Sequence, residues 1–307
     1  MEFDPFARGP FPVGVRSGLA IDAKRGDRTL PFEVWYPATT AARDAEVQPG
    51  RHPLVIYSHA SSGHRRQSSF LCTHLAGHGY VVAAADHTGN TAIDSAERSR
   101  RAAAGEVLTP NERDAFLRQI IADRVPDLRF LLDEMLSPTA PGSLCSEIDD
   151  QRVGLIGWSF GGWAALATLE ADDRVGALVA LAPAGNSKPL EGIISATLTF
   201  RWKREVPTLF LVAEKDRFTP LVGQYELFDR TPSKKAMFIL RNADHVHFAD
   251  QIDDEALCSR ANAHLFTRGL SLAHLEAVLN KSVAAQKFMA GDPVARLREL
   301  GVEAASH

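Results

Sequence analysis

The chain has 307 residues, of which 45% are hydrophobic and 23% charged, with 22 glycines and 17 prolines. These values are typical of a globular protein with a sizeable core, and the length favours one large domain, residues 1–307, with decorated loops. The formal net charge is -4, without the basic surface that a phosphate backbone requires, so we expect no nucleic-acid partner.

The first predicted elements are two short strands within residues 14–36. Residues 24–27, Lys-Arg-Gly-Asp, form a turn signal between them, and the second strand alternates apolar and polar positions at Leu30, Phe32 and Val34. A period of two around a tight turn predicts an antiparallel hairpin at the edge of a sheet.

The later apolar runs are continuous rather than alternating, which is typical of strands buried on both faces of a parallel sheet. They are residues 54–57, 81–85, 153–156, 177–181 and 209–212. Stretches of helical length and period lie between them, at 67–77, 125–136, 162–170 and 221–228. The alternation predicts an α/β fold with a mostly parallel central sheet flanked by helices.

Three regions exceed the short connections of such a sheet: residues 88–124, 184–205 and 268–307. We treat them as candidate lid and pocket elements. Within the first, residues 95–117 are rich in charge and alanine, which indicates either a solvated pair of surface helices or a substrate cover. A helical lid or cap insertion is therefore expected at about 88–124.

No apolar run approaches the roughly 20 residues of a membrane-spanning helix. Residues 1–16 do not combine a charged leader with an apolar core, so we expect no signal peptide and a cytoplasmic protein. The three cysteines, Cys72, Cys145 and Cys258, are widely spaced and lack zinc-ligand spacing. Reduced structural thiols, and no metal site, are the expectation.

The strongest motif is G-x-S-x-G at residues 157–161, between a predicted strand and a predicted helix. This context is typical of a nucleophile elbow. Gly157 and Gly161 would make room for a strained turn that exposes the Ser159 hydroxyl at a helix N-terminus. There the backbone N–H of Phe160 can stabilise an oxyanion. The alternative is a glycine-rich helix start with an idle serine.

A serine nucleophile needs a base, and the base needs an orienting carboxylate, which in this context follow the serine in the order acid, then histidine. The loop 213–220 leaves a predicted strand and contains two acids. We favour Asp216. Glu214 is the rival, and its alternative role is to fix the loop by bonding backbone amides.

Two histidines follow the last predicted strand, residues 236–240. We favour His245 as the base, because it stands on a loop that enters an apolar helix start. His247 is expected to line the substrate pocket or to cap that helix. His59 and His87 also lie at strand ends, but both precede the serine and are expected to shape loops through hydrogen bonds.

The loop after the strand 54–57 consists largely of small residues, which let backbone N–H groups approach a substrate. We favour the N–H of Ser61 as the second oxyanion donor, with that of Ala60 next. Ala60 and Trp158 are also expected to contact the substrate. An apolar acyl or alcohol pocket could be shaped by further aromatic residues, namely Phe160, Trp163 and Trp202.

These residues resemble the α/β-hydrolase superfamily, and within it the branch of dienelactone-hydrolase-like proteins and platelet-activating-factor acetylhydrolases. The likeness covers most of the chain. It is carried by PFPVGV (10–15), EVWYP (33–37), YSH (57–59), LAGHGYVVAAADH (75–87), SFGG (159–162) and His245 followed by FAD (248–250).

The resemblance implies a hydrolase of short or oxidised acyl chains and small esters, without metal or organic cofactor. The chain departs from the branch in two ways. Dienelactone hydrolases proper use a cysteine where this chain has Ser159, which argues against their substrate. The acetylhydrolases carry their acid after the strand that follows the elbow helix, whereas residues 180–183 contain no carboxylate. The later Asp216 resembles the acid of bacterial polyester hydrolases and lipase-like relatives.

The sequence therefore predicts a serine carboxylesterase that acts on small or short-to-medium acyl esters through an acyl-enzyme. An acyltransferase or a thioesterase would use the same residues. A peptidase, or a non-catalytic ligand-binding protein on the same fold, is a further alternative. The expected partner is a small-molecule ester, and a homodimer is left open.

Overall fold

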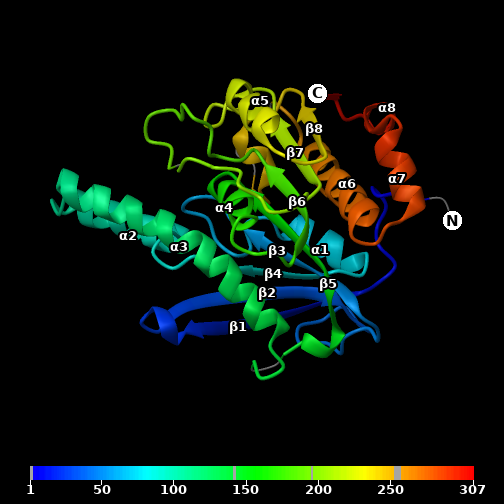
Figure 1. The fold of residues 1–307 in the computed structure, drawn as a ribbon, viewed down its shortest axis with the longest axis horizontal. Helices are drawn as coiled ribbons and strands as arrows, with labels where there is room; N and C mark the ends of the chain where they lie inside the picture. Colours follow the sequence, from blue (N-terminus) through cyan, green and yellow to red (C-terminus); the bar gives the residue numbers. More distant parts are fainter. Residues whose placement is uncertain (1–2, 141–142, 195, 252–256) are drawn as a thin grey trace.

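Nine strands of the described residues form one sheet in the computed structural model (Figure 1). The structure describes residues 3–140, 143–194, 196–251 and 257–307. The strand order is β1-β2-β4-β3-β5-β6-β7-β8-β9. The strands are β1 (Val13–Asp22), β2 (Arg28–Pro37), β3 (His52–Ser58), β4 (Val81–Ala85), β5 (Ile148–Trp158), β6 (Val175–Leu181), β7 (Thr208–Ala213), β8 (Lys235–Leu240) and β9 (Ala304–Ser306).

The central strands are parallel, and both edges of the sheet are antiparallel. Strand β2 pairs antiparallel with β1 and with β4. Parallel pairing then runs from β4 through β3, β5, β6 and β7 to β8, and β9 closes the sheet antiparallel to β8. The predicted fold class, a mostly parallel sheet with an antiparallel N-terminal hairpin, is confirmed.

Helices cover both faces of the sheet. Residues of α1 and α6 share one buried cluster, and residues of α3, α4 and α5 share the other. The helices are α1 (Ser69–Gly77), α2 (Ala92–Ala103), α3 (Pro110–Leu136), α4 (Phe160–Thr168), α5 (Leu221–Arg230), α6 (Arg260–Val278), α7 (Val283–Ala290) and α8 (Pro293–Glu299).

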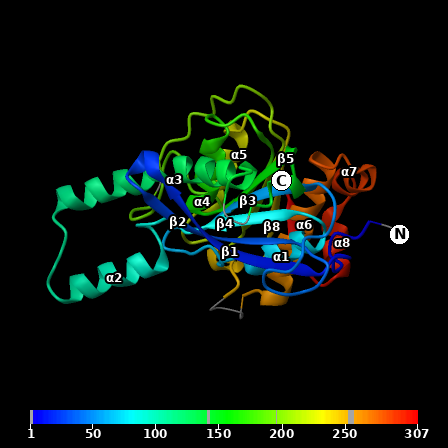
Figure 2. The same ribbon diagram turned by 90° about the horizontal axis from the view of Figure 1, so that it is seen from below.

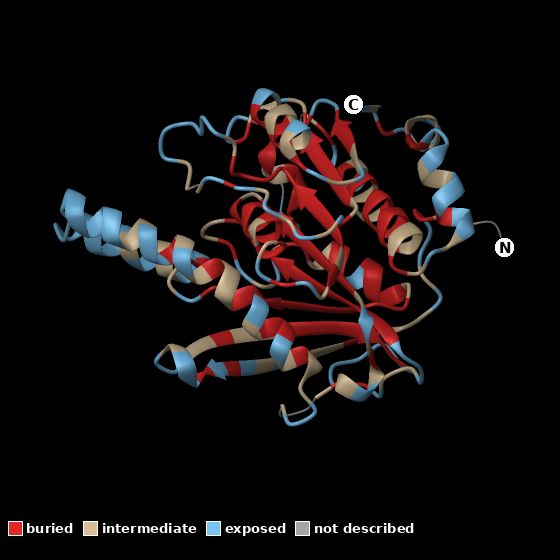
Figure 3. Cartoon of the chain, viewed as in Figure 1, coloured by how far each residue is buried: buried red, intermediate tan, exposed pale blue. Residues whose placement is uncertain are grey.

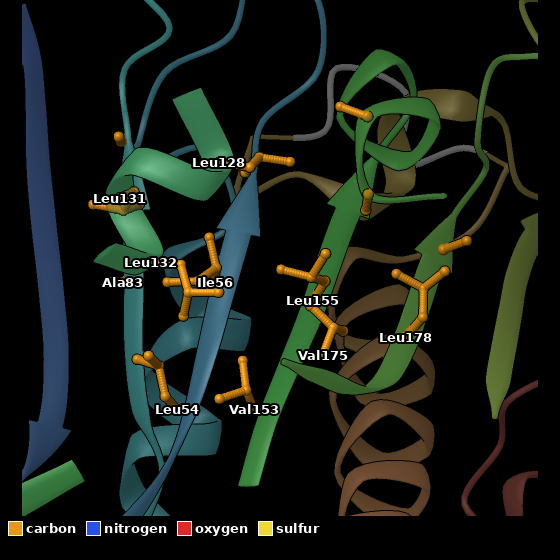
Figure 4. Packing of buried hydrophobic residues seen from close by; sticks show 14 of the residues in the cluster. Leu54, Ile56, Ala83, Leu128, Leu131, Leu132, Val153, Leu155, Val175 and Leu178 are labelled. Atoms are coloured by element: carbon orange, nitrogen blue, oxygen red, sulfur yellow. The ribbon is translucent and has the colours of Figure 1, made fainter. Parts of the chain in front are cut away.

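Burial on both faces explains why the strand sequences are continuously apolar. In β3, Leu54 and Ile56 pack with Leu128 and other leucines of α3 (Figure 4). Val55, between them in sequence, belongs to the cluster on the opposite face. Successive strand side chains point to opposite faces, so each residue of this strand meets a helix layer. Each fully buried aliphatic side chain contributes roughly 1.5–3 kcal/mol.

Helix α2 and the first half of α3 form a hairpin that projects from the body of the molecule (Figures 1 and 2). Both helices begin with a capping box, Thr91 with Asp94 and Thr109 with Glu112, which satisfies their first backbone N–H groups. Helix α2 has no buried residue, and Figure 3 shows the exposed tip. The expected pair of surface helices is present, and its action as a lid stays a prediction.

Two expectations about segments were wrong. A helix was expected to begin at residue 125, but α3 starts at Pro110 and continues through Pro126, because the leucines beyond Pro126 pack on the sheet. The tail 268–307 was a candidate lid or pocket element. It instead completes α6, adds α7 and α8, and supplies the edge strand β9. Within the described residues, no helix is both long and apolar enough to span a membrane.

Candidate active site

Ser159 stands in a strained turn between β5 and α4. Its backbone has φ 57° and ψ -118°, a region that side chains other than glycine rarely adopt. A Cβ at Gly157 would lie 2.1 Å from the carbonyl oxygen of Gly161, and a Cβ at Gly161 would lie 2.2 Å from that of Ser58. Both positions therefore require glycine, as the motif predicted.

The turn places Ser159 at the carboxyl edge of the sheet. Its N–H donates to the carbonyl of Leu181, at the end of β6, over 2.9 Å. Its side chain is half-buried, while Trp158 and Phe160 on either side are buried. The serine is thus fixed by backbone contacts while its side chain keeps access to solvent at the N-terminus of α4.

Asp216 lies on the loop after β7, with its carboxylate held in place by four groups. One oxygen accepts hydrogen bonds from the N–H groups of Phe218 (2.8 Å) and Thr219 (2.7 Å). The other accepts from the Thr219 hydroxyl (2.8 Å) and lies 2.7 Å from Nδ1 of His245. Asp216 is 6% exposed. A carboxylate so placed favours the proton on Nδ1 and leaves the lone pair on Nε2.

His245 begins a short 3-10 turn, His245–Phe248, after β8. Its N–H donates to Asp244 Oδ1 over 2.7 Å, and Nε of Arg217 donates to Asp244 Oδ2 over 2.7 Å. Burial of Asp244 raises the pKa of its carboxyl, but the hydrogen bonds from His245 and Arg217 outweigh burial and lower that pKa below its usual value. The carboxylate therefore ties the loop of Asp216 to that of His245.

The two rival residues take structural positions. Glu214 accepts a hydrogen bond from the N–H of Asn242 over 2.9 Å and pairs with Arg241, as its loop-fixing alternative expected. His247 is fully buried, with Nδ1 3.0 Å from the N–H nitrogen of Asp244 and Nε2 3.2 Å from the carbonyl oxygen of Cys258. Of the two roles expected for His247, this geometry fits capping of the turn that begins at His245 and does not fit lining of the substrate pocket.

Aromatic rings surround the imidazole. The ring centroid of Trp158 lies 5.4 Å from that of His245, and the ring centroid of Phe218 lies 5.3 Å away. Trp158 is buried, whereas Phe218 is 45% exposed. Sequence reasoning gave Phe218 no role, although a large apolar residue two positions after the candidate acid was the available signal. Trp163 stacks on Phe160 inside the core, and Trp202 packs against Phe200.

The loop after β3 carries the two candidate oxyanion donors, Ser61 and Ala60. The N–H of Ala60 donates to Gln67 Oε1 over 3.1 Å. Within the described residues, the N–H groups of Ser61 and Phe160 have no acceptor. Ser62 adopts a φ of 56°, which turns the chain directly after Ser61. This geometry favours Ser61 over Ala60 as an oxyanion donor.

Buried histidines brace the same loop, as expected. Nδ1 of His59 lies 2.7 Å from the carbonyl oxygen of Ala60. Nε2 of His87 lies 3.0 Å from the Ser58 hydroxyl, and its Nδ1 lies 3.0 Å from Asp127 Oδ2. Burial lowers the pKa of His59 well below its usual value and that of His87 to about 4. Both rings are therefore neutral hydrogen-bonding groups near neutral pH.

The three cysteines are free, and Cys72 and Cys258 are buried. Burial raises the pKa of both thiols, so neither forms a thiolate readily at neutral pH. This arrangement agrees with the expected reduced, structural role.

Comparison with solved structures identifies the fold. A ferulic acid esterase from Streptomyces cinnamoneus superposes with a TM-score of 0.67 at 23% sequence identity, covering 89% of this chain and 91% of the other. The chain has the α/β-hydrolase fold. In this chain Ser159, Asp216 and His245 follow β5, β7 and β8, three strands of the parallel part of that sheet.

Sequence comparisons find relatives of one kind. Residues 37–124 match the family model of platelet-activating factor acetylhydrolase, isoform II. The acetylhydrolase of Gallus gallus is 22% identical over 272 residues, covering 77% of this chain and 62% of the relative. That of Bos taurus is 29% identical over 168 residues, covering 47% of this chain and 38% of the relative. The chain thus spans less than two thirds of these relatives, and the predicted resemblance is confirmed.

Proposed function

We propose that this α/β-hydrolase is a serine carboxylesterase. The observation that carries the proposal is the 2.7 Å contact between Asp216 and Nδ1 of His245, beside a serine held at φ 57°. The ring contact between Trp158 and His245 brings the imidazole next to the elbow. Together with the chain order of serine, acid and histidine, these contacts support nucleophilic catalysis by Ser159.

In the proposed reaction, Ser159 Oγ bonds to the ester carbonyl carbon as Nε2 of His245 takes the hydroxyl proton. The carbonyl oxygen becomes an oxyanion and accepts hydrogen bonds from the N–H groups of Phe160 and Ser61. The imidazolium, stabilised by Asp216, gives its proton to the alkoxide that leaves. Water repeats the sequence on the acyl-enzyme, releases the carboxylic acid and restores the serine.

Small or short-to-medium acyl esters are the proposed substrates. The relatives are named as an acetylhydrolase and as an esterase, which supports ester chemistry. The half-exposed ring of Phe218 beside His245 supports an apolar contact for the acyl or alcohol group. No metal or organic cofactor enters the proposed reaction.

The test is turnover of p-nitrophenyl esters from acetate to octanoate by the wild-type protein and by Ser159→Ala. We expect release of p-nitrophenol that is lost in the variant, and the best chain length measures the acyl site. Added alcohols that divert the acyl group to a new ester faster than water would favour an acyltransferase. No turnover of any ester would contradict the proposal.

Three further expectations stay predictions. They are the organisation of residues 1–307 as one domain with a lid at about 88–124, a cytoplasmic location, and a homodimer. Size-exclusion chromatography with light scattering measures the last of these directly, and a monomer at micromolar concentration would rule out the homodimer.

A further inference from the structure

Arg124 of α3 is fully buried, although no carboxylate among the described residues accepts a hydrogen bond from its guanidinium. It donates instead to neutral oxygen atoms. Nη1 donates to the carbonyl of His59 over 2.7 Å, and Nη2 donates to that of Ala60 over 3.2 Å and to Asn90 Oδ1 over 2.5 Å. A buried charge is costly to keep unless its hydrogen bonds serve the fold or the site, so these partners call for an explanation.

The Ala60 carbonyl is one end of the peptide unit whose other end is the free N–H of Ser61. The Ala60 oxygen is contacted by Arg124, by Nδ1 of His59 (2.7 Å) and by the N–H of Gly63 (3.1 Å). The structure contains no cis peptide among its described residues, so the Ser61 N–H points away from this oxygen. Fixing the oxygen therefore fixes the direction of the N–H. A cation on the oxygen also polarises the peptide and strengthens the N–H as a donor.

The same guanidinium contacts the other half of the oxyanion site. Its central carbon lies 4.6 Å from the ring centroid of Phe160, the residue whose N–H is the second free donor. Phe160 is 1% exposed, so the contact is sealed from water. One side chain thus spans the two backbone segments that must keep a common distance from the substrate oxygen.

Asn90 extends this arrangement to the base of the helical hairpin. Its Nδ2 donates to Ser61 Oγ over 3.2 Å, and the N–H of Ala92 donates to the carbonyl of Gly63 over 2.8 Å. Both ends of the hairpin, at Asn90 and at Arg124, are therefore hydrogen-bonded to the loop 58–63. Burial lowers the pKa of Arg124 to about 9, which still leaves the guanidinium charged near neutral pH.

We propose that Arg124 is a positioning residue of the oxyanion hole, which links the loop of Ser61 to Phe160 and helps to hold the Ser61 N–H at its working orientation. The inference rests on the proposed esterase function. It predicts that shortening the side chain weakens stabilisation of the transition state more than binding of the ester. Removing one oxyanion donor typically lowers kcat by about 10²–10³-fold, and misorienting one should cost somewhat less.

The experiment compares Arg124→Lys with Arg129→Lys, a control on the same helix whose side chain is half-exposed and pairs with Asp172. Lysine keeps the charge but loses the planar fork that reaches two carbonyls and an amide together. We expect kcat for p-nitrophenyl acetate, per active site titrated with a fluorophosphonate, to fall roughly 10- to 100-fold. KM should stay within about threefold, and the control should match the wild type.

A second readout separates positioning from general damage. A trifluoromethyl ketone adds to the serine as a tetrahedral oxyanion, so its affinity should fall by the same factor as kcat. Asn90→Ala should shift both quantities in the same direction, because it removes one of the groups that hold Arg124. An unchanged kcat per titrated site in Arg124→Lys would overturn the proposal.

Crystal structures of the wild type and of Arg124→Lys test the positioning role independently of the proposed esterase activity. A displaced loop 58–63 in the variant supports the positioning role even when no ester is turned over. Missing turnover by itself contradicts only the esterase proposal. A loop that superposes on the wild type within coordinate error overturns the positioning role whatever the activity.

Discussion

Gly161→Ala tests how tightly the elbow and the oxyanion loop are packed together. The new Cβ would lie 2.2 Å from the carbonyl oxygen of Ser58 and 2.6 Å from that of His59. Relief of the shorter contact to 3.0 Å requires an opening of about 0.8 Å. The atoms that must move are backbone, so the loop that carries Ser61 has to shift. A displacement near 1 Å at a reacting centre costs roughly 10²-fold in rate, and such overpacking costs about 1–3 kcal/mol of stability.

The assay pairs kcat for p-nitrophenyl acetate with the free energy of unfolding in urea. Gly77→Ala is the matched control, because its Cβ would meet nothing closer than 3.7 Å at the end of α1. That variant should keep its kcat and gain about 0.4–1 kcal/mol, as alanine restricts the unfolded chain. A Gly161→Ala protein with wild-type rate and stability would refute the reasoning.

The remaining predictions concern the candidate acid Asp216, the aromatic ring of Phe218 and the pH dependence of stability. Asp216→Asn should lower kcat by about 10³–10⁴-fold at unchanged fold, whereas Glu214→Gln, which removes only a loop contact, should stay within about twofold; equal losses would contradict the assignment. Phe218→Ala should raise KM for butyrate and longer esters by about 3- to 10-fold and leave kcat for acetate unchanged, since only apolar contact is lost. Burial lowers the pKa of His274 from 6.5 to about 4, so the unfolded chain takes up the proton first. Stability is therefore lost as pH falls from 6.5 to 4, by about 2 kcal/mol per such group between pH 7 and pH 5. Urea unfolding at pH 7 and pH 5 measures this loss, and the free energy of unfolding of His274→Gln should change less between the two pH values than that of the wild type.

The fold could be predicted from the sequence wherever the residue pattern of a segment is compatible with only one structural environment. The run 54–57 is apolar without alternation because Leu54 and Val55 meet different helix layers, and this is visible in the sequence. Strand β9 could not be foreseen, because Ala-Ala-Ser carries no strand signal and is defined only by its pairing with β8. The unbroken α3 was missed because Pro126 normally ends a helix, and tertiary packing overrode that preference.

The candidate site also contains features that the local sequence predicts and features that depend on long-range contacts. The elbow follows from local sterics at Gly157 and Gly161, and the order of acid and histidine follows from chain topology. Arg124 was invisible to sequence reasoning, since an arginine in a charged helix is typical of a solvated surface. Only the three-dimensional placement of α3 against the loop after β3 buries it. The partners of a buried polar side chain are long-range, 64 and 65 residues away here, and no local pattern encodes them.

The central claim is that Ser159 is a nucleophile activated by His245 and Asp216. Intact-mass spectrometry after incubation with a fluorophosphonate tests it most directly, because only an activated serine displaces the fluoride. We expect one adduct per chain, located at Ser159 by peptide mapping, absent in Ser159→Ala and formed far more slowly in Asp216→Asn. An unmodified wild-type protein, or an adduct that persists in Ser159→Ala, would contradict the account.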